Sequence, residues 1–307
     1  MPRYFHALAM TCAASAALLS PAASADTGKL LLTGGVSSID GAAGGGLTPW
    51  AVIGTNATDE EIGGSAFLTH VGTRDYGLNV VGAALGVKDR FEFSVARQDF
   101  DTKGTGIALG LPGLHLKQTI FGAKAKVYGD AILDSDTLMP QIAVGLEYKT
   151  LASSGLDGTL DALGAKRHGV DAYVSATKLL LGQSVLLNTT LRATKANQNG
   201  LLGYGATLGG SENNYSIQPE FSAAYLLSKN VVVGAEYRFM RNKLQAAGNA
   251  AGLGNGLRAS DWKDIFVAWA PSKNFSLTLA YVDLGVIVPA VAQKKQTGFY
   301  ISAQLAL

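Results

Sequence analysis

Apolar and polar residues alternate along most of this chain, and such alternation predicts strands because successive side chains of a strand point to opposite faces. The final stretch, 297–307, shows the pattern well: its odd positions from Phe299 to Leu307 are apolar, and its even positions are small or polar. A strand with one apolar and one polar face suits the wall of a membrane β-barrel. We expect 297–307 to close such a barrel against its first strand.

The same alternation recurs upstream, most cleanly in 91–98, 141–149, 215–225, 231–239 and 275–281. Aromatic residues gather near the ends of these segments, as Tyr148 and Tyr281 do. Barrel proteins place aromatic residues at the two membrane interfaces. The segments therefore have the length, alternation and aromatic ends of membrane-crossing strands, and no mature stretch is apolar enough for a membrane helix.

Short and long connections alternate between these segments. Tight polar turns are expected at Lys88-Asp89, Gly182-Gln183, Lys229-Asn230 and Ser272-Lys273-Asn274. Long loops rich in Gly, Ala and Asn are expected at 101–113, 150–168, 197–213, 242–260 and 285–296. Outer-membrane barrels have this asymmetry, with short periplasmic turns and longer external loops. The sequence thus predicts an all-β fold consisting of a single antiparallel transmembrane β-barrel.

The number of strands depends on the amino-terminal part of the chain. The first mature strand is expected at Lys29–Val36, followed by a glycine-rich stretch and a second candidate strand at Leu47–Thr55. With Leu47–Thr55 in the wall the barrel has about 14 strands, and without it about 12. In the second case much of 37–63 folds into the lumen or the periplasmic mouth. Residues 26–63 are therefore wall or plug, and 64–307 form the remainder of the barrel.

Two residues conflict with this interpretation. Pro219 lies within a candidate wall strand, where it removes a hydrogen-bond donor that lipid cannot replace, and it could mark a bulge. The last residue is Leu307, whereas barrels of this class usually end on an aromatic residue.

The amino terminus predicts export. Arg3 precedes an apolar run over 7–19, and Ala23-Ser24-Ala25 predicts cleavage of a 1–25 signal peptide after Ala25. The single cysteine, Cys12, is lost with the signal, so disulfides are excluded. The remaining 24 basic and 23 acidic residues nearly balance, which disfavours nucleic acid as a partner and predicts weak ion selectivity. The expected location is the outer membrane of a Gram-negative bacterium.

Three stretches carry a family resemblance: 28–39, 41–54 and 89–98. They resemble a proteobacterial envelope family known as domain of unknown function 3034, and the resemblance extends over essentially the whole mature chain. It implies a Gram-negative source and an envelope location. It brings no established activity and no catalytic residues to carry over.

Polar and charged residues collect on the faces expected to point inward. These candidate lumen-lining residues are Glu92, Gln98, Gln141, Glu147, Lys149, Arg192, Gln218, Glu220, Glu236 and Arg238. Mixed charges of this kind can form a constriction that selects solutes by size and charge, or they can pair and close the interior. Because about 12–14 strands enclose more space than side chains fill, we expect a channel or transporter for small solutes.

Three alternatives remain. The barrel could be a structural or surface-interaction protein without conductance. It could be an outer-membrane hydrolase, with His168 near Asp161 and Asp171, although no enzyme, cofactor or catalytic residue is expected. It could also be a soluble periplasmic sandwich, which the many aromatic outward faces disfavour. No metal site is expected, because His70, His115 and His168 lack partners at ligand spacing. The expected partners are outer-membrane lipid, the barrel-assembly machinery through the carboxyl-terminal strand, and a small solute.

Overall fold

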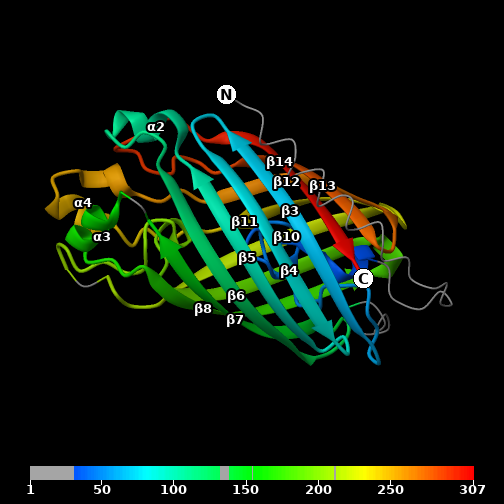
Figure 1. Cartoon of the computed structure of the whole chain (residues 1–307). Coiled ribbons are helices and arrows are strands. Elements are labelled where there is room, and N and C mark those ends of the chain that lie inside the picture. The colour runs from blue at the N-terminus through cyan, green and yellow to red at the C-terminus, as the bar shows by residue number, and fades with distance from the viewer. Residues whose placement is uncertain (1–30, 132–137, 154, 211) are drawn as a thin grey trace.

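The computed structural model describes residues 31–131, 138–153, 155–210 and 212–307, so the signal peptide predicted for 1–25 lies outside the described residues. Twelve antiparallel strands form one closed barrel (Figure 1). No helix in the described part of the chain is both long and apolar enough to cross a membrane. The predicted all-β, antiparallel barrel is confirmed, with the smaller of the two expected strand numbers.

Each wall strand pairs with its neighbours in sequence, and β14 pairs with β3 from Gly298↔Thr73 to Ala306↔Ser65, which closes the barrel. The wall strands are β3 (Ile62–Thr73), β4 (Gly77–Val87), β5 (Phe91–Asp101), β6 (His115–Tyr128), β7 (Gln141–Ala152), β8 (His168–Leu180), β9 (Val185–Thr194), β10 (Ser216–Ser228), β11 (Val231–Arg238), β12 (Trp262–Ser272), β13 (Phe275–Asp283) and β14 (Thr297–Ala306).

The first strand expected at Lys29–Val36 is not a wall strand in the described residues, and Leu47–Thr55 follows the second of the two alternatives, outside the wall. Within the first, Leu31–Gly34 form the 3-10 helix η2, and the short strands β1 (Val36–Ser37) and β2 (Ala43–Gly44) pair only with each other. Every residue of 36–55 is buried, whereas a wall strand exposes alternate residues to lipid. This segment, which we call the plug, lies inside the barrel and contacts the inward side chains of the wall strands.

The two ends of the barrel differ as the loop pattern predicts. Tight connections at 88–90, 181–184, 229–230 and 273–274 lie at one end, which includes the 3-10 helix η3 (Leu181–Gln183). Long loops lie at the other end and carry α2 (Lys103–Ala108), α3 (Asp157–Leu163), η4 (Gln198–Gly200), α4 (Gln245–Ala250) and η5 (Gly254–Leu257). Helices α2, α3 and α4 gather at this long-loop end in Figure 1.

The outer surface of the wall is apolar. Large apolar side chains are exposed on every wall strand except β11, as Leu68 (59% exposed), Phe93 (53%) and Phe299 (73%) illustrate. Inward neighbours of these residues are buried, so the burial pattern alternates along the strands. An exterior of this kind is suited to the hydrocarbon of a membrane.

Pro219 is accommodated at the end of a strand ladder. β10 pairs with β11 only from Glu220↔Arg238 onward, and the Pro219 carbonyl accepts from Phe239 N at 3.1 Å, just beyond that ladder. The N–H and C=O of one residue in an antiparallel strand point to the same side, so the missing donor falls where β11 has already ended. The irregularity in this ladder lies between Leu226 and Ser228, not at Pro219.

Leu307 extends the closing ladder beyond β14. Its N–H donates to Gly64 O at 2.8 Å, and Gly64 N donates to Leu307 O at 3.0 Å. Its side chain is exposed. Leu307 therefore occupies the outward position in which an aromatic residue is usual, and its side chain is also apolar.

Several glycines make room for inward aromatic rings on the next strand. Gly145 stands directly across from Tyr173, and Gly234 across from Phe266. A Cβ atom at Gly145 would overlap the Tyr173 ring, and one at Gly234 would lie 2.6 Å from the Phe266 ring. The absence of a side chain therefore lets each ring lie against the neighbouring strand.

Gly145→Ala should lower the stability of the barrel. The added methyl group would push Tyr173 off the wall and into the packed lumen, a kind of overpacking that costs about 1–3 kcal/mol. The measurement is the temperature at which the refolded protein loses its compact gel mobility. Gly64→Ala is the control, because a methyl there would meet only Ala84 O, at 4.0 Å, and should leave that temperature unchanged. Equal effects of the two substitutions would contradict the steric explanation.

Candidate functional site: the plugged lumen

The lumen is filled where the plug meets the wall. All ten predicted lumen-lining residues lie on inward positions and are at most 4% exposed: Glu92, Gln98, Gln141, Glu147, Lys149, Arg192, Gln218, Glu220, Glu236 and Arg238. Most of them bond to the plug or pair with one another, and Gln218 lies across the β9–β10 ladder from Arg192. Instead of lining open water, these side chains surround a segment of their own chain.

Glu236 on β11 binds the part of the plug that follows strand β2. Its carboxylate accepts from Leu47 N at 2.7 Å, from Thr48 N at 3.2 Å and from Thr48 Oγ1 at 2.5 Å. Ser222 Oγ on β10 also donates to it, at 2.8 Å. One wall carboxylate thereby satisfies two main-chain N–H groups that are buried away from water, which would otherwise cost free energy.

Glu92 on β5 binds the plug at two points that are distant along the chain. It accepts from Ala43 N at 3.0 Å and from Gly54 N at 2.6 Å. Lys124 on β6 pairs with this carboxylate at 3.1 Å and donates to the carbonyls of Ala43 and Trp50. Lys124 was missed at the level of sequence, although it alternates in step with inward Gln118 and Ile120 on the same strand.

Neutral polar contacts hold the turn of the plug around Pro49. The Pro49 carbonyl accepts from Thr190 Oγ1 at 2.7 Å and from Ser175 Oγ at 3.2 Å. Ala51 N donates to Thr177 Oγ1 at 2.8 Å, and Gln141 Nε2 donates to Ala51 O. These hydroxyl and amide groups come from β7, β8 and β9, three neighbouring strands of the wall.

Asp40, at the turn between β1 and β2, meets the cations of the wall. Its Oδ2 lies 3.1 Å from Arg238 Nη1, 3.6 Å from Lys149 Nζ and 4.0 Å from Arg192 Nη2. Arg238 also donates to the Leu47 carbonyl, so this one arginine contacts the plug both at Asp40 and at Leu47. Asp40 was not among the predicted residues, because nothing local distinguishes a single aspartate in a glycine-rich segment.

The wall cations are balanced by wall carboxylates. Arg192 pairs with Glu147 and with Glu220 at 2.6 Å each, and Lys149 pairs with Glu147 at 3.1 Å and Asp171 at 3.0 Å. The Arg192 guanidinium also lies 5.3 Å from the centre of the Tyr173 ring. Buried ions are stable only when they are paired and hydrogen-bonded, so this network fixes the strands β7 to β11 in register.

A loop from the long-loop end meets the tip of the plug. Asn199 Nδ2 donates to Asp40 Oδ1 at 2.9 Å, and Gln118 Nε2 donates to Asn199 O at 3.1 Å. Above this contact an apolar cluster closes the mouth, and its buried members include Leu160, Leu201, Leu244 and Ile287. The lumen is therefore filled from one end by the plug and from the other by loops.

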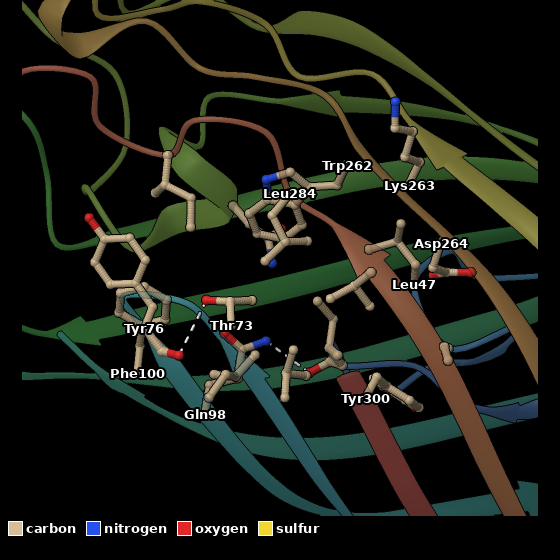
Figure 2. A pocket seen from close by; sticks show the side chains of 18 of the residues that line it. Leu47, Thr73, Tyr76, Gln98, Phe100, Trp262, Lys263, Asp264, Leu284 and Tyr300 are labelled. Atoms are coloured by element: carbon tan, nitrogen blue, oxygen red, sulfur yellow. Dashed lines mark hydrogen bonds between the residues drawn. The ribbon is translucent and has the colours of Figure 1, made fainter. Parts of the chain in front are cut away.

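Two apolar cavities remain beside the plug. The outer cavity lies between β3–β5 and β12–β14 near the long-loop end and measures about 50 Å³. Figure 2 shows Phe100, Trp262, Leu284 and Tyr300 around it. The inner cavity lies toward the tight turns, between the plug and β8–β12, and measures about 450 Å³. Gly45 and Phe266 border both cavities.

Comparison with protein families matches residues 33–304 to the DUF3034 family, described as a protein of unknown function. The chain belongs to this family. Comparison with curated proteins found no match. The DUF3034 match covers the plug, the wall and the closing strand.

Solved structures of outer-membrane proteins are similar to this DUF3034 chain at low sequence identity. The NanC porin has a TM-score of 0.51 and 6% identity, over 80% of this chain and 100% of that one. The KdgM porin has a TM-score of 0.48 and 8% identity, over 78% and 98%. Outer membrane phospholipase A from Escherichia coli has a TM-score of 0.41 and 10% identity, over 78% and 89%. The likeness to NanC shows an outer-membrane type of barrel fold and no more.

The residues considered for hydrolysis do not come together in the DUF3034 barrel. His168 is exposed, whereas Asp171 points inward and pairs with Lys149, and Asp161 pairs with Arg167. On the outer surface His70 Nδ1 and Asn79 Oδ1 lie 2.7 Å apart, but among the described residues no hydroxyl is bonded to the other ring nitrogen. A His–Asn pair needs such a nucleophile for acyl transfer. No cluster of three metal-ligating side chains occurs in the described ranges.

Acid should release Asp40 only far below neutral pH. Burial acts to raise its pKa, but the neighbouring Lys149, Arg238 and Arg192 charges outweigh burial and hold the pKa well below its ordinary value of 3.8. A group with a lowered pKa contributes its stability above the unfolded-state pKa and loses it as pH falls through the folded-state pKa. The ion pairs of Asp40 with these three cations should thus persist from about pH 8 to about pH 4. Following the Asp40 carboxyl carbon by NMR over that range checks this, and protonation of Asp40 near pH 6 would contradict it.

Proposed function

We propose that this protein is an outer-membrane channel or transporter for a small solute, and that the plug is its gate. The observation that carries the proposal is that a complete barrel encloses a separate segment, 36–55, held largely by hydrogen bonds and ion pairs to inward wall residues. Twelve strands enclose more space than their own side chains fill. Removing the plug would therefore leave a polar-lined passage through the wall.

The proposed location is the outer membrane of a Gram-negative bacterium, reached after cleavage of the signal peptide behind Ala25. The apolar exterior would contact lipid, and the tight turns would face the periplasm. The carboxyl-terminal strand β14 would present the last segment to the barrel-assembly machinery. The connection from the carboxyl-terminal end of the plug to β3, through 56–61, would then lie on the periplasmic side.

The hydrogen bonds between the plug and the wall fit a movable gate better than a permanent seal. Water can replace the hydrogen bonds that Glu92 and Glu236 make to plug N–H groups, so displacing the plug leaves no polar group unsatisfied. The wall charges also balance in part without Asp40: the carboxylates of Glu92, Glu147, Asp171, Glu220, Glu236 and Asp264 face the cations of Lys124, Lys149, Arg192 and Arg238. The wall network can thus remain ionised around an open, hydrated lumen.

The deciding experiment is single-channel recording of a variant that lacks 36–55, refolded and inserted into a planar bilayer. The intact protein should be closed, and the deletion should give discrete current steps because the lumen fills with water. Correct folding of both is verified by heat-dependent gel mobility. Reversal potentials in a salt gradient should show at most weak cation selectivity, since the inward carboxylates, Asp264 included, only slightly outnumber the inward cations.

The loops at the mouth require a second variant. The loop carrying Asn199 also fills the lumen, so the deletion is combined with replacement of 197–203 by a short glycine linker. Current in either variant supports the proposal. Two folded variants that both remain silent would overturn it and favour a structural or surface-interaction barrel.

A further inference from the structure

We infer that the solute is uncharged and largely hydrocarbon, with one hydroxyl group, and that it moves along the inner face of β12 through the two cavities. This inference rests on the proposed gate function and names its substrate class. The ionic network cannot serve as the recognition site, because its cations and carboxylates bind one another and the plug. The cavities lie beside that network and have a different chemistry.

The outer cavity is apolar and is built by one side chain from each of several strands. Its wall includes Val71, Leu78, Phe100, Trp262, Val282 and Tyr300. These residues come from β3, β4, β5, β12, β13 and β14 in turn. Leu201 and Ile287 from the mouth loops cover it, so movement of these loops would enlarge its volume of about 50 Å³ and admit a solute from outside.

The inner cavity has the size of a small-molecule site. Its volume of about 450 Å³ falls within the range of about 300–1,000 Å³ that ligand sites usually have. Its lining is also apolar, and includes Val52 of the plug with Leu179, Leu186, Leu226, Val232 and Ala268 of the wall. The polar members of the lining, Ser184, Ser228 and Lys229, lie at the tight turns, so an ion that moves past them would lose its hydration without gaining a partner. The interior of the cavity therefore favours an apolar occupant.

A thin partition separates the two cavities. It consists of Gly45 of the plug and the Phe266 side chain of β12, which border both spaces. Gly45 has no side chain, and a Cβ atom there would meet the Glu236 carboxylate and lie 2.9 Å from Trp50. The Phe266 ring lies against Gly234. Displacing the part of the plug around Gly45 therefore joins the two cavities into one apolar path.

Polar atoms in the outer cavity point to a hydroxyl group on the solute. Trp262 Nε1 and Gln198 Oε1 have no hydrogen-bond partner among the described residues, although the two side chains are only 5% and 2% exposed. Asp264 Oδ1 and Tyr300 Oη are also unpartnered there, and the Asp264 oxygen disfavours an anion. Trp262 donates, Gln198 and Asp264 accept, and Tyr300 can do either, so a hydroxyl can satisfy each of them. Apolar sites with a few polar groups are typical of small-molecule recognition.

The three tryptophans of the chain allow a direct test. Trp262 borders the outer cavity, Trp50 borders the inner cavity, and Trp269 is 46% exposed on the outward face. Three variants each keep one tryptophan and replace the other two by phenylalanine. Each is refolded, placed in lipid nanodiscs and titrated with 4-bromophenol, whose bromine quenches nearby tryptophan fluorescence. Heat-dependent gel mobility verifies folding.

Quenching of Trp262 and Trp50 should saturate and should not depend on the amount of lipid. Quenching of Trp269 should instead follow partition of the probe into lipid. The anion 4-bromobenzoate should bind about tenfold more weakly or worse, because a buried unpaired carboxylate is costly. Ala268→Phe fills the inner cavity and should abolish saturable quenching of Trp50 while sparing Trp262. Ala235→Phe, on the outward face of the neighbouring strand, is the control and should change neither.

The outcomes separate this inference from the proposed function. Quenching of Trp262 and Trp50 that scales with lipid, as at Trp269, would overturn the inference, and so would equal saturable binding of 4-bromobenzoate. If the deletion variants conduct ions while no saturable quenching occurs, the result supports the proposed gate and contradicts the proposed hydrocarbon solute. Saturable quenching with silent deletion variants would show occupied cavities in a barrel that does not transport.

Discussion

Glu236→Ala should convert the closed barrel into one that opens repeatedly. In the intact protein this carboxylate accepts from Leu47 N, Thr48 N and Thr48 Oγ1, all of them on the plug. Each such bond contributes about 1 kcal/mol or more, so losing all three should shift the closing equilibrium by about 3 kcal/mol. That change corresponds to a roughly 100-fold greater open population. Glu92 and Asp40 would still hold the plug, so the openings should be brief.

Single-channel recording of the refolded variant gives the open probability directly. The matched control is Glu60→Ala, which removes an exposed carboxylate from the connection between plug and wall. It should leave the protein as closed as the wild type, whereas Glu236→Ala should show frequent steps of the size seen after plug deletion. An open probability that is the same in both variants would mean that the wall carboxylates do not control the plug.

The wall strands were predictable because interactions between residues close in the sequence determine them. In 91–98 and 141–149 a residue's face follows from its position alone, since lipid demands apolar side chains on one side at every second residue. The same rule located Glu147 and Arg192 on the inward side without any knowledge of their partners. Tight turns at 88–90 and 229–230 follow equally from short-range signals. Interactions within a few residues determine all of these features.

The plug was not predictable in this way, because its partners are distant in the sequence. Thr48 bonds to Glu236, 188 residues away, and Ser37 bonds to Gln304, 267 residues away. Leu47–Thr55 has the composition of a strand, and only its burial on every side distinguishes it from a wall segment. Asp40 likewise gains its importance from Lys149, Arg192 and Arg238, which come from three separate strands. Contacts of this range arise only once the barrel has closed.

Arg192→Leu should cause the largest loss of stability, because it removes the central cation of the luminal network. The guanidinium holds Glu147 and Glu220 at 2.6 Å each, and it is almost fully buried. Breaking a buried ion pair by removing one partner costs about 3–5 kcal/mol, since the remaining charges are left without compensation. Lys149 and Arg238 would still neutralise part of this charge. The variant should unfold at a clearly lower temperature in the gel-mobility assay, or should fail to refold.

A second substitution distinguishes loss of charge balance from loss of packing. Arg192→Leu combined with Glu220→Gln removes the carboxylate that Arg192 Nε contacts, and it should recover part of the lost stability because one less buried charge needs a partner. Arg97→Leu, an exposed arginine on β5 that forms no ion pair among the described residues, should not lower the unfolding temperature. If the double variant is no more stable than Arg192→Leu, the contribution of Arg192 lies in its packing against Tyr173 instead of its charge. The wall network would then be a consequence of closing the barrel.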